Sequence, residues 1–204
     1  MQEAAFIWDL DGTLLDSYEA ILAGIEETYR QFSLPYNKKE VRAFILKYSV
    51  QDLLEQVAKE RGLDVGLLNQ VRARSLSEKN AQVVLMSGAR EVLAWADQRG
   101  IQQFVYTHKG DNALTILRDL GLDVYFTEIL TSQSGFARKP SPEAATYLIS
   151  KYHLKPERTF YIGDRTLDID FAQNSGIQSI NFLGTPVDCN HQISCLADIP
   201  SLFF

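Results

Sequence analysis

The sequence is poor in cysteine and contains no long apolar run, and these two shortages exclude several classes of protein. Only Cys189 and Cys195 occur among 204 residues, which argues against a disulfide scaffold or a cysteine-based metal site. No segment is long and apolar enough to span a bilayer, and the N-terminus lacks the pattern of a secretion signal. We therefore expect a cytoplasmic protein with reduced thiols.

Basic residues are also in the minority. The chain has 20 Lys and Arg against 26 Asp and Glu, a formal net charge of −6. This balance argues against nucleic acid or an anionic membrane as the main partner, and no obligate protein partner is evident. Hydrophobic residues make up 46% of the chain, an ordinary share for a globular protein, and the length suits one α/β core with a modest insertion.

The most informative feature that is present is a pair of acids behind a short apolar run. Residues 4–8 are apolar throughout, as expected for a strand covered on both faces of a parallel sheet. Asp9 and Asp11 follow at its carboxyl end, and Gly12 allows a tight turn. Ligands bind beyond the carboxyl ends of strands in open α/β sheets, so these carboxylates are placed for chemistry. Alone, the same string also fits an ordinary surface turn.

Three later segments present polar residues in a comparable setting. An apolar run at 103–106 leads into a hydroxyl residue, a lysine precedes a helix-like segment after residue 140, and a second apolar run at 159–162 leads into another pair of acids. The residues concerned are Thr107, His108, Lys139, Asp164 and Asp168.

This order of acid pair, hydroxyl, lysine and second acid pair resembles the four signature motifs of the haloacid dehalogenase-like hydrolase superfamily, from Phe6 to about Asn181. The resemblance is to the phosphoglycolate phosphatase and β-phosphoglucomutase-like branch with a small helical cap. It implies an α/β fold, with a Rossmann-like parallel sheet core and a helical cap inserted after the first strand. The core would comprise residues 1–16 and 83–204, and the cap residues 17–82.

The resemblance also implies a reaction. Asp9, the first acid of the motif, would be the nucleophile that forms an aspartyl-phosphate. Asp11 would protonate the leaving oxygen and then activate the attacking water. An acid at this second position favours phosphoryl chemistry over carbon–halogen cleavage, because a phosphate ester needs a proton on its leaving group. The expected activity is therefore phosphoric monoester hydrolysis on a small phosphorylated metabolite.

Several carboxylates that converge on a phosphate need a cation. Hard oxygen ligands suit Mg²⁺. The resemblance implies that the Asp9 side chain, the Asp11 backbone carbonyl and Asp164 hold the ion, with Asp168 as a ligand or as a partner of the ligands.

The remaining motif residues would bind the phosphoryl group. Thr107 offers a hydroxyl and neighbouring backbone N–H groups, and Lys139 offers an ammonium. We expect His108 to assist them in binding phosphate. Relatives commonly have Asn or Ser where this chain has His108, and a small hydroxyl residue where it has Arg165, so Arg165 is a candidate specificity residue.

The predicted cap supplies further candidates for substrate selection. Lys47, Tyr48 and Gln51 lie between its second and third predicted helices, where relatives often contact substrate. A β-phosphoglucomutase would be expected to carry an arginine near Gln51 to hold a second phosphate, and glutamine has no charge. This weakens the hypothesis that the chain is a mutase.

Periodicity predicts alternating helices and strands outside the cap. The expected helices are about 17–32, 38–47, 51–61, 65–79, 88–99, 112–120, 142–153 and 168–175, and the expected strands are 103–106, 128–130, 159–162 and 178–182 in addition to the first. Ser141 and Pro142 are typical of an N-cap followed by the first helical position. Such alternation predicts parallel strands joined by right-handed crossovers.

Two other functions stay open at this point. A phosphotransferase or phosphomutase would need a second phosphate site and protection of the phospho-enzyme from water. A non-catalytic phosphate-binding module would be expected to have lost at least one of Asp9, Asp11, Lys139 or Asp164, and the chain retains all four.

Overall fold

The computed structural model describes residues 4–79, 83–110 and 112–203, which fold into two units. The first unit comprises residues 1–16 and 85–204, and the second comprises residues 17–84. The expected boundary at residue 82 falls in the stretch 80–82, which lies outside the described residues. The predicted role of the second unit as a cap over the site stays a prediction.

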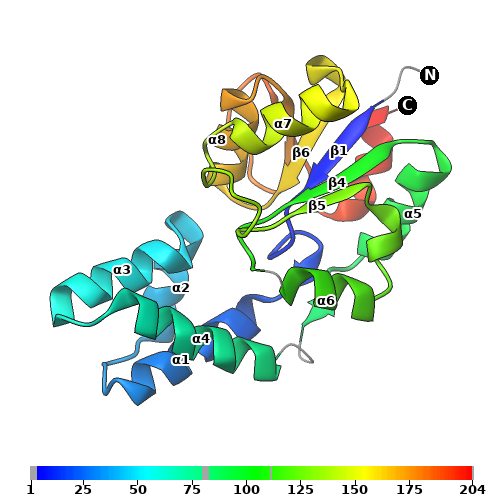
Figure 1. Cartoon of the computed structure of the whole chain (residues 1–204). Coiled ribbons are helices and arrows are strands. Elements are labelled where there is room, and N and C mark those ends of the chain that lie inside the picture. The colour runs from blue at the N-terminus through cyan, green and yellow to red at the C-terminus, as the bar shows by residue number, and fades with distance from the viewer. Residues whose placement is uncertain (1–3, 80–82, 111, 204) are drawn as a thin grey trace. The chain divides into compact units, whose positions relative to one another are not determined.

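The first unit is built on a six-stranded sheet (Figure 1). The strand order is β5-β4-β1-β6-β7-β8, and every neighbouring pair is parallel. The strands are β1 Ala5–Trp8, β4 Gln102–Tyr106, β5 Glu128–Leu130, β6 Thr159–Gly163, β7 Gln178–Asn181 and β8 Asn190–Gln192. The predicted α/β class with a parallel sheet is confirmed.

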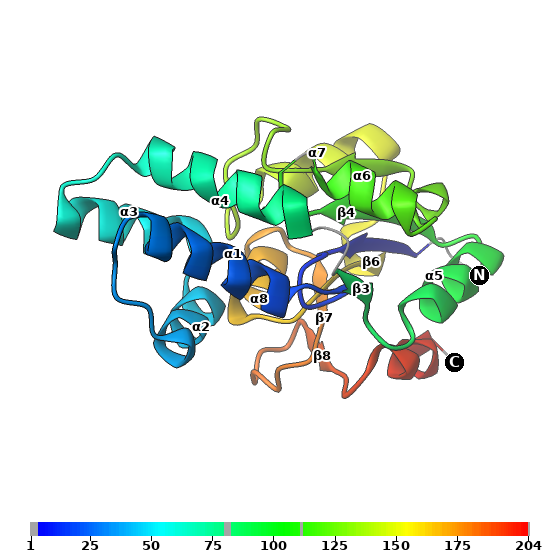
Figure 2. The ribbon, with the colours of Figure 1, turned by 90° about the horizontal axis from the view of Figure 1, so that it is seen from below.

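Helices cover both faces of this sheet. They are α5 Ala89–Gln98, α6 Asn112–Asp119, α7 Glu143–Tyr152 and α8 Thr166–Asn174, with 3₁₀ turns η2 Asp123–Tyr125, η3 Pro156–Arg158 and η4 Leu196–Phe203. Figure 1 shows α7 and α8 on one side of the strands and α5 and α6 on the other. In Figure 2 the C-terminal turn η4, drawn in red, lies beside α5, where the Trp95 and Phe203 rings are 6.0 Å apart.

Alternation along β1 divides the core of the first unit between these two faces. Ile7 belongs to a buried cluster with residues of α7 and α8, such as Leu148 and Phe171. Phe6 points the other way, and its ring lies 6.5 Å from that of Trp95 and 5.2 Å from that of Phe203. Because both faces of β1 are buried, its four residues form the continuous apolar run seen in the sequence.

The second unit is helical. Its helices are α1 Tyr18–Gln31, α2 Lys38–Lys47, α3 Val50–Arg61 and α4 Val65–Lys79. Two buried apolar clusters form its core, one centred on α1 and α2 and one that joins α3 to α4. The chain enters and leaves this unit through two short strands, β2 Leu15–Asp16 and β3 Val84–Leu85, which pair with each other.

Local signals set the ends of these helices. Asn37 caps α2, since its Oδ1 accepts the N–H groups of Lys39 and Glu40. Gly62 ends α3 in the left-handed conformation at φ +65°, which is common at helix C-termini. The predicted cap of α7 is wrong by one position. Pro142, not Ser141, is the residue before the first helical one, and no side chain caps that helix.

The structure also contains elements that the sequence did not predict. These are the strand pair β2–β3, the edge strand β8 and the 3₁₀ turns. The helix expected to start at Asp168 begins two residues earlier, at Thr166. Within the described residues, no helix combines the length and apolar character needed to cross a membrane.

Candidate active site

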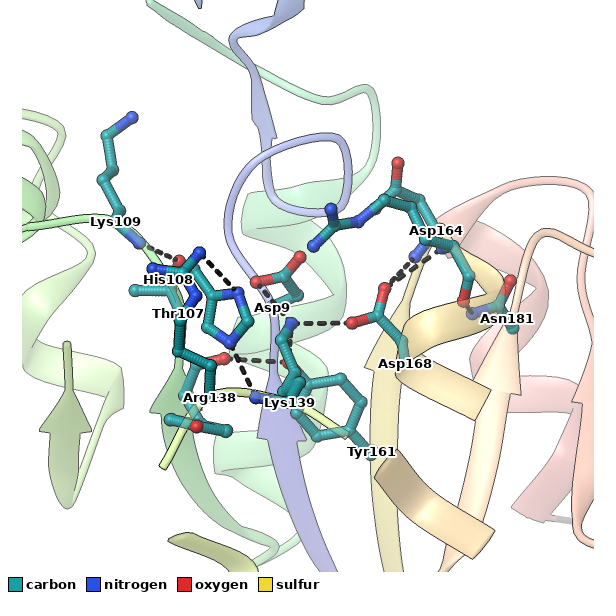
Figure 3. Close-up of polar contacts among 12 residues, drawn as sticks. Asp9, Thr107, His108, Lys109, Arg138, Lys139, Tyr161, Asp164, Asp168 and Asn181 are labelled. Carbon is teal, nitrogen blue, oxygen red and sulfur yellow. Dashed lines mark hydrogen bonds and ion pairs between the residues drawn. The ribbon is translucent and has the colours of Figure 1, made fainter. Parts of the chain in front are cut away.

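Three of the four sequence motifs meet around one buried lysine at the carboxyl ends of β1 and β6 (Figure 3). Lys139 Nζ lies 2.6 Å from Asp168 Oδ1 and 3.3 Å from Asp9 Oδ1, and it donates to the Tyr161 hydroxyl at 2.8 Å. The Lys139 side chain is fully buried. An ammonium has three N–H donors. Two of them bind the Tyr161 hydroxyl and Asp168, and Asp9 lies within ion-pair distance of the same nitrogen.

Of the three contacts, the one to Asp9 is the longest. Charge-assisted N–H···O bonds are ordinarily 2.7–2.9 Å, and the 3.3 Å contact with Asp9 exceeds that range. The third N–H group of Lys139 is therefore the one that an incoming oxygen can bind. Tyr161 keeps a second proton occupied while its own hydroxyl donates to the Tyr106 carbonyl at 2.8 Å.

Both carboxylate oxygens of Asp168 have hydrogen-bond partners. Oδ1 takes the ion pair with Lys139, and Oδ2 accepts the backbone N–H groups of Asp164 and Arg165 at 3.2 and 3.1 Å. Burial opposes ionisation of this carboxyl, but the charges of Lys139 and Arg165 outweigh it and lower the pKa of Asp168. Asp168 thus fixes both the lysine and the loop that carries Asp164.

Asp9 has the opposite electrostatic balance. Burial raises the pKa of the Asp9 carboxyl, and the nearby Lys139 only partly offsets it. Repulsion from the carboxylates of Asp168 and Asp11 adds to the rise. A further positive charge beside Asp9 would therefore favour its ionised form.

The donor set around Asp9 fits such a charge. Asp9, Asp164 and Asp168 each offer a carboxylate oxygen, and these atoms lie within 4.8 Å of one another. Hard oxygen donors at this spacing suit Mg²⁺. Because both oxygens of Asp168 already have partners, Asp9 and Asp164 are the better candidates for direct ligands. The Asp11 carboxylate lies outside this cluster, as expected if Asp11 contributes its backbone carbonyl.

Asp11 instead meets a residue that the sequence reasoning did not assign to the site. Its Oδ1 pairs with Lys109 Nζ at 2.9 Å, and the Lys109 side chain is only 8% exposed. The Lys109 backbone is held by two bonds, since its N–H donates to Thr107 Oγ1 and its carbonyl accepts the Ser132 N–H. The sequence offered one signal for Lys109, namely its position two residues after Thr107.

Thr107 lies where predicted, directly beyond β4. Its N–H continues the sheet ladder to the Leu130 carbonyl at 3.0 Å, and its side chain is buried. His108 turns toward the lysine segment. Its Nε2 lies 2.8 Å from the Lys139 backbone N–H donor, and its Nδ1 lies 3.0 Å from Arg138 Nη2. That His108 binds phosphate stays a prediction.

Arg165 and Asn181 complete the polar groups near β6 and β7. The positive charge of Arg165 acts on Asp9, Asp168 and His108. Asn181 is fully buried, accepts the Leu183 N–H and donates to the Arg165 carbonyl at 3.1 Å. The sequence signal for Asn181 was a polar residue at the end of an apolar strand.

The other predicted specificity residues belong to the second unit. Lys47 Nζ lies 5.0 Å from the centre of the Tyr48 ring, and Tyr48 is 46% exposed. Gln51 accepts from Asn69 Nδ2 at 3.1 Å and donates to Glu55 at 2.7 Å. Its amide therefore binds neighbouring helix residues. That any of these three residues contacts substrate stays a prediction.

Comparison with known proteins places this arrangement in a family. The family model described as Haloacid dehalogenase-like hydrolase matches residues 6–182, a span that includes all four motifs. The chain belongs to the haloacid dehalogenase-like hydrolases. The predicted family and the prediction of an enzyme of this hydrolase class are confirmed.

Several relatives are named as phosphatases or pyrophosphatases. A phosphoglycolate phosphatase from Pseudomonas putida is 24% identical over 96% of this chain and 74% of its own length. Pyrophosphatase PpaX from Oceanobacillus iheyensis is 25% identical over 94% of this chain and 88% of its own. Among solved structures, the core domain of a proposed phosphoglycolate phosphatase from Streptococcus pneumoniae TIGR4 is 47% identical, with a TM-score of 0.61 and coverage of 100% and 96%.

Proposed function

We propose that this hydrolase is a Mg²⁺-dependent phosphatase that acts on a small phosphorylated metabolite through a phospho-enzyme on Asp9. The observation that carries the proposal is the convergence of Asp9, Asp164, Asp168 and Lys139 at the carboxyl ends of β1 and β6. The names of the relatives support phosphoryl chemistry. They differ in substrate, so the proposal stops at the class.

In the first step, a carboxylate oxygen of Asp9 attacks phosphorus while the bond from phosphorus to the leaving oxygen breaks. Asp11 gives a proton to that oxygen, and the alcohol departs. Lys139 and the backbone N–H groups beyond Thr107 offset negative charge on the transferring phosphoryl group. A bound Mg²⁺ ion would supply additional positive charge at the same place.

In the second step, a water oxygen attacks phosphorus and the bond to Asp9 breaks. Asp11 accepts a proton from that water, so that inorganic phosphate is released and both aspartates return to their starting states. Lys109 Nζ lies 2.9 Å from Asp11 Oδ1 and orients this carboxyl group. Asp168 acts by fixing Lys139 and the Asp164 loop, without touching the reacting atoms itself.

Hydrolysis of p-nitrophenyl phosphate tests this proposal. We expect activity only with Mg²⁺, and we expect Asp9→Asn to lower kcat by roughly a thousandfold or more, because the amide is a far weaker nucleophile. Asp97→Asn is the matched control, because it makes the same change at an exposed position of α5. Full activity in Asp9→Asn would exclude the phospho-enzyme.

Mg²⁺ binding can be measured without turnover. We expect titration calorimetry to show that the native chain binds Mg²⁺ and that Asp164→Asn weakens this binding strongly. An unchanged affinity in Asp164→Asn would exclude Asp164 as a ligand, whatever the enzyme activity.

A further inference from the structure

His108 directs its ring at the backbone of the catalytic lysine segment. The residue follows Thr107 at the end of β4, and its Nε2 lies 2.8 Å from the N–H nitrogen of Lys139. The two residues are 31 positions apart in the chain, so this contact joins the loop after β4 to the loop before α7. Figure 3 shows the ring between these two loops.

The ring lies between two hydrogen-bond donors, and this setting opposes its protonated form. The Lys139 N–H faces one ring nitrogen, and the Arg138 guanidinium lies 3.0 Å from the other. A neutral imidazole has one acceptor nitrogen, and an imidazolium has none. Burial, together with the charges of Lys139, Arg138 and Arg165, lowers the pKa of His108 to about 2. The ring is therefore neutral, with Nε2 accepting from the Lys139 N–H and the ring proton on Nδ1. A neutral ring is poorly suited to bind a phosphate oxygen as a cation would.

The Lys139 backbone has particular need of an anchor. The Lys139 ammonium must reach Asp9, Asp168 and the Tyr161 hydroxyl at once, so a small shift of its Cα would break at least one of these contacts. The other supports of this segment lie to either side of Lys139. The Ala137 N–H donates to Glu143, and the Ser141 N–H donates to the Arg138 carbonyl. At residue 139 itself, the backbone N–H donates to His108 Nε2 and also acts on the nearby Tyr106 hydroxyl.

We propose that His108 is a positioning residue that holds the Lys139 backbone through Nε2, and that it does not bind the phosphoryl group itself. This inference rests on the proposed phosphatase function for its kinetic readout only. It assigns this chain's histidine a task different from the phosphate contact expected from its place in the motif.

Two amide substitutions separate the two roles. The side-chain oxygen of glutamine lies at about the reach of Nε2, whereas that of asparagine lies at about the reach of Nδ1. If His108 anchors the Lys139 N–H, His108→Gln can accept the same bond and His108→Asn cannot. If His108 contacts phosphate, at a position where relatives commonly carry Asn, His108→Asn is the conservative change.

The decisive experiment measures Lys139 amide hydrogen exchange by NMR in the full chain, for the native protein and both variants. Exchange reads the hydrogen bond directly and needs no turnover, so it decides the inference even if the phosphatase function fails. We expect the Lys139 amide to be protected in the native protein and in His108→Gln, and to exchange at least tenfold faster in His108→Asn.

Kinetics with p-nitrophenyl phosphate and Mg²⁺ supply the second readout. We expect His108→Asn to lower kcat at least tenfold with less than a threefold change in KM, and His108→Gln to recover most of the loss. Retained protection of the Lys139 amide in His108→Asn would overturn the inference. So would a rise in KM in His108→Gln with native kinetics in His108→Asn, since that pattern belongs to a phosphate contact.

Discussion

At the scale of single residues, the site depends on buried side chains with several polar partners each. Lys139 hydrogen-bonds to Tyr161 and Asp168 and forms an ion pair with Asp9, and Asp168 has a partner on each oxygen. Such buried networks are costly to leave half-satisfied. The arrangement therefore limits how the Lys139 ammonium can move, and it leaves the long contact to Asp9 as the one that a phosphoryl oxygen can share.

His108 gives this site a measurable dependence on pH. Its pKa falls from 6.5 to about 2 in the folded chain, first through burial and then through Lys139, Arg138 and Arg165. Below pH 6.5 the unfolded chain binds a proton that the folded chain does not, so folding stability is lost as pH falls from 6.5 toward 2. The slope from this one group reaches at most about 1.4 kcal/mol per pH unit.

Urea unfolding at several pH values between 6 and 4 measures this contribution. We expect His108→Gln to lose stability less steeply than the native protein as pH falls, because glutamine does not titrate. Asp9 and Asp168 titrate in both proteins, so their effects largely cancel in the comparison. Identical slopes would mean that His108 titrates as an exposed histidine does.

At the scale of elements, the turn from β6 into α8 places two motif acids through a close backbone approach. A Cβ added at Gly163 would lie 2.5 Å from the Cβ, Cγ and Oδ2 atoms of Asp168. Asp168 cannot move away without losing its ion pair with Lys139 and its two hydrogen bonds from backbone N–H groups. Glycine is therefore required here by space rather than by an unusual backbone angle.

Gly163→Ala should accordingly damage both stability and activity. We expect the free energy of unfolding to fall by about 1–3 kcal/mol, as for other overpacked sites, and kcat to fall with it. Gly184→Ala is the matched control, because its nearest neighbour, at 2.6 Å, is the flexible end of Gln192. Equal effects of the two substitutions on unfolding would show that Asp168 gives way easily.

The elements that the sequence predicted best are those with a strong local signal. The apolar run of β1 and the periodic helices α2 and α6 carried their own evidence in the chain. The strand β8 was missed because Asn190–Gln192 is a short polar segment whose identity comes from pairing with β7. Asn37 and Glu40 at the start of α2 carried a cap signal that was available in the sequence.

The candidate site divides in the same way. The motif residues Asp9, Thr107, Lys139 and Asp164 could be named because they follow apolar strands or stand in a recognisable order. The contacts of His108, Lys109 and Tyr161 could not, because each depends on a partner from 22 to 98 residues away. Strand order decides which loops come together, and the local sequence does not predict strand order.

At the scale of the whole molecule, the two units have separate apolar cores. Trp8 and Trp95 are the only tryptophans in the chain, and both belong to the first unit. Trp8 is fully buried and donates from Nε1 to Gln103 Oε1 at 3.1 Å. Tryptophan fluorescence therefore follows the unfolding of the first unit, whereas far-ultraviolet circular dichroism also follows the helices of the second.

A pair of core truncations tests whether the units unfold separately. Leu54 is fully buried in the second unit, and Leu148 is fully buried in the first. Each change to alanine should remove about 2–5 kcal/mol from its own unit. We expect Leu148→Ala to shift the fluorescence midpoint and Leu54→Ala to leave it in place. A common shift in both variants would mean that the chain unfolds as one cooperative block.

The short strands β2 and β3 determine how the second unit could be replaced. They bring the points where residues 17–84 begin and end into one hydrogen-bonded pair. The chain therefore leaves the first unit and returns to it at one place. Exchange of residues 17–84 for another segment would leave the strand order and the motif acids of the first unit in place. Residues 17–84 can therefore be exchanged as one piece through a single pair of neighbouring junctions.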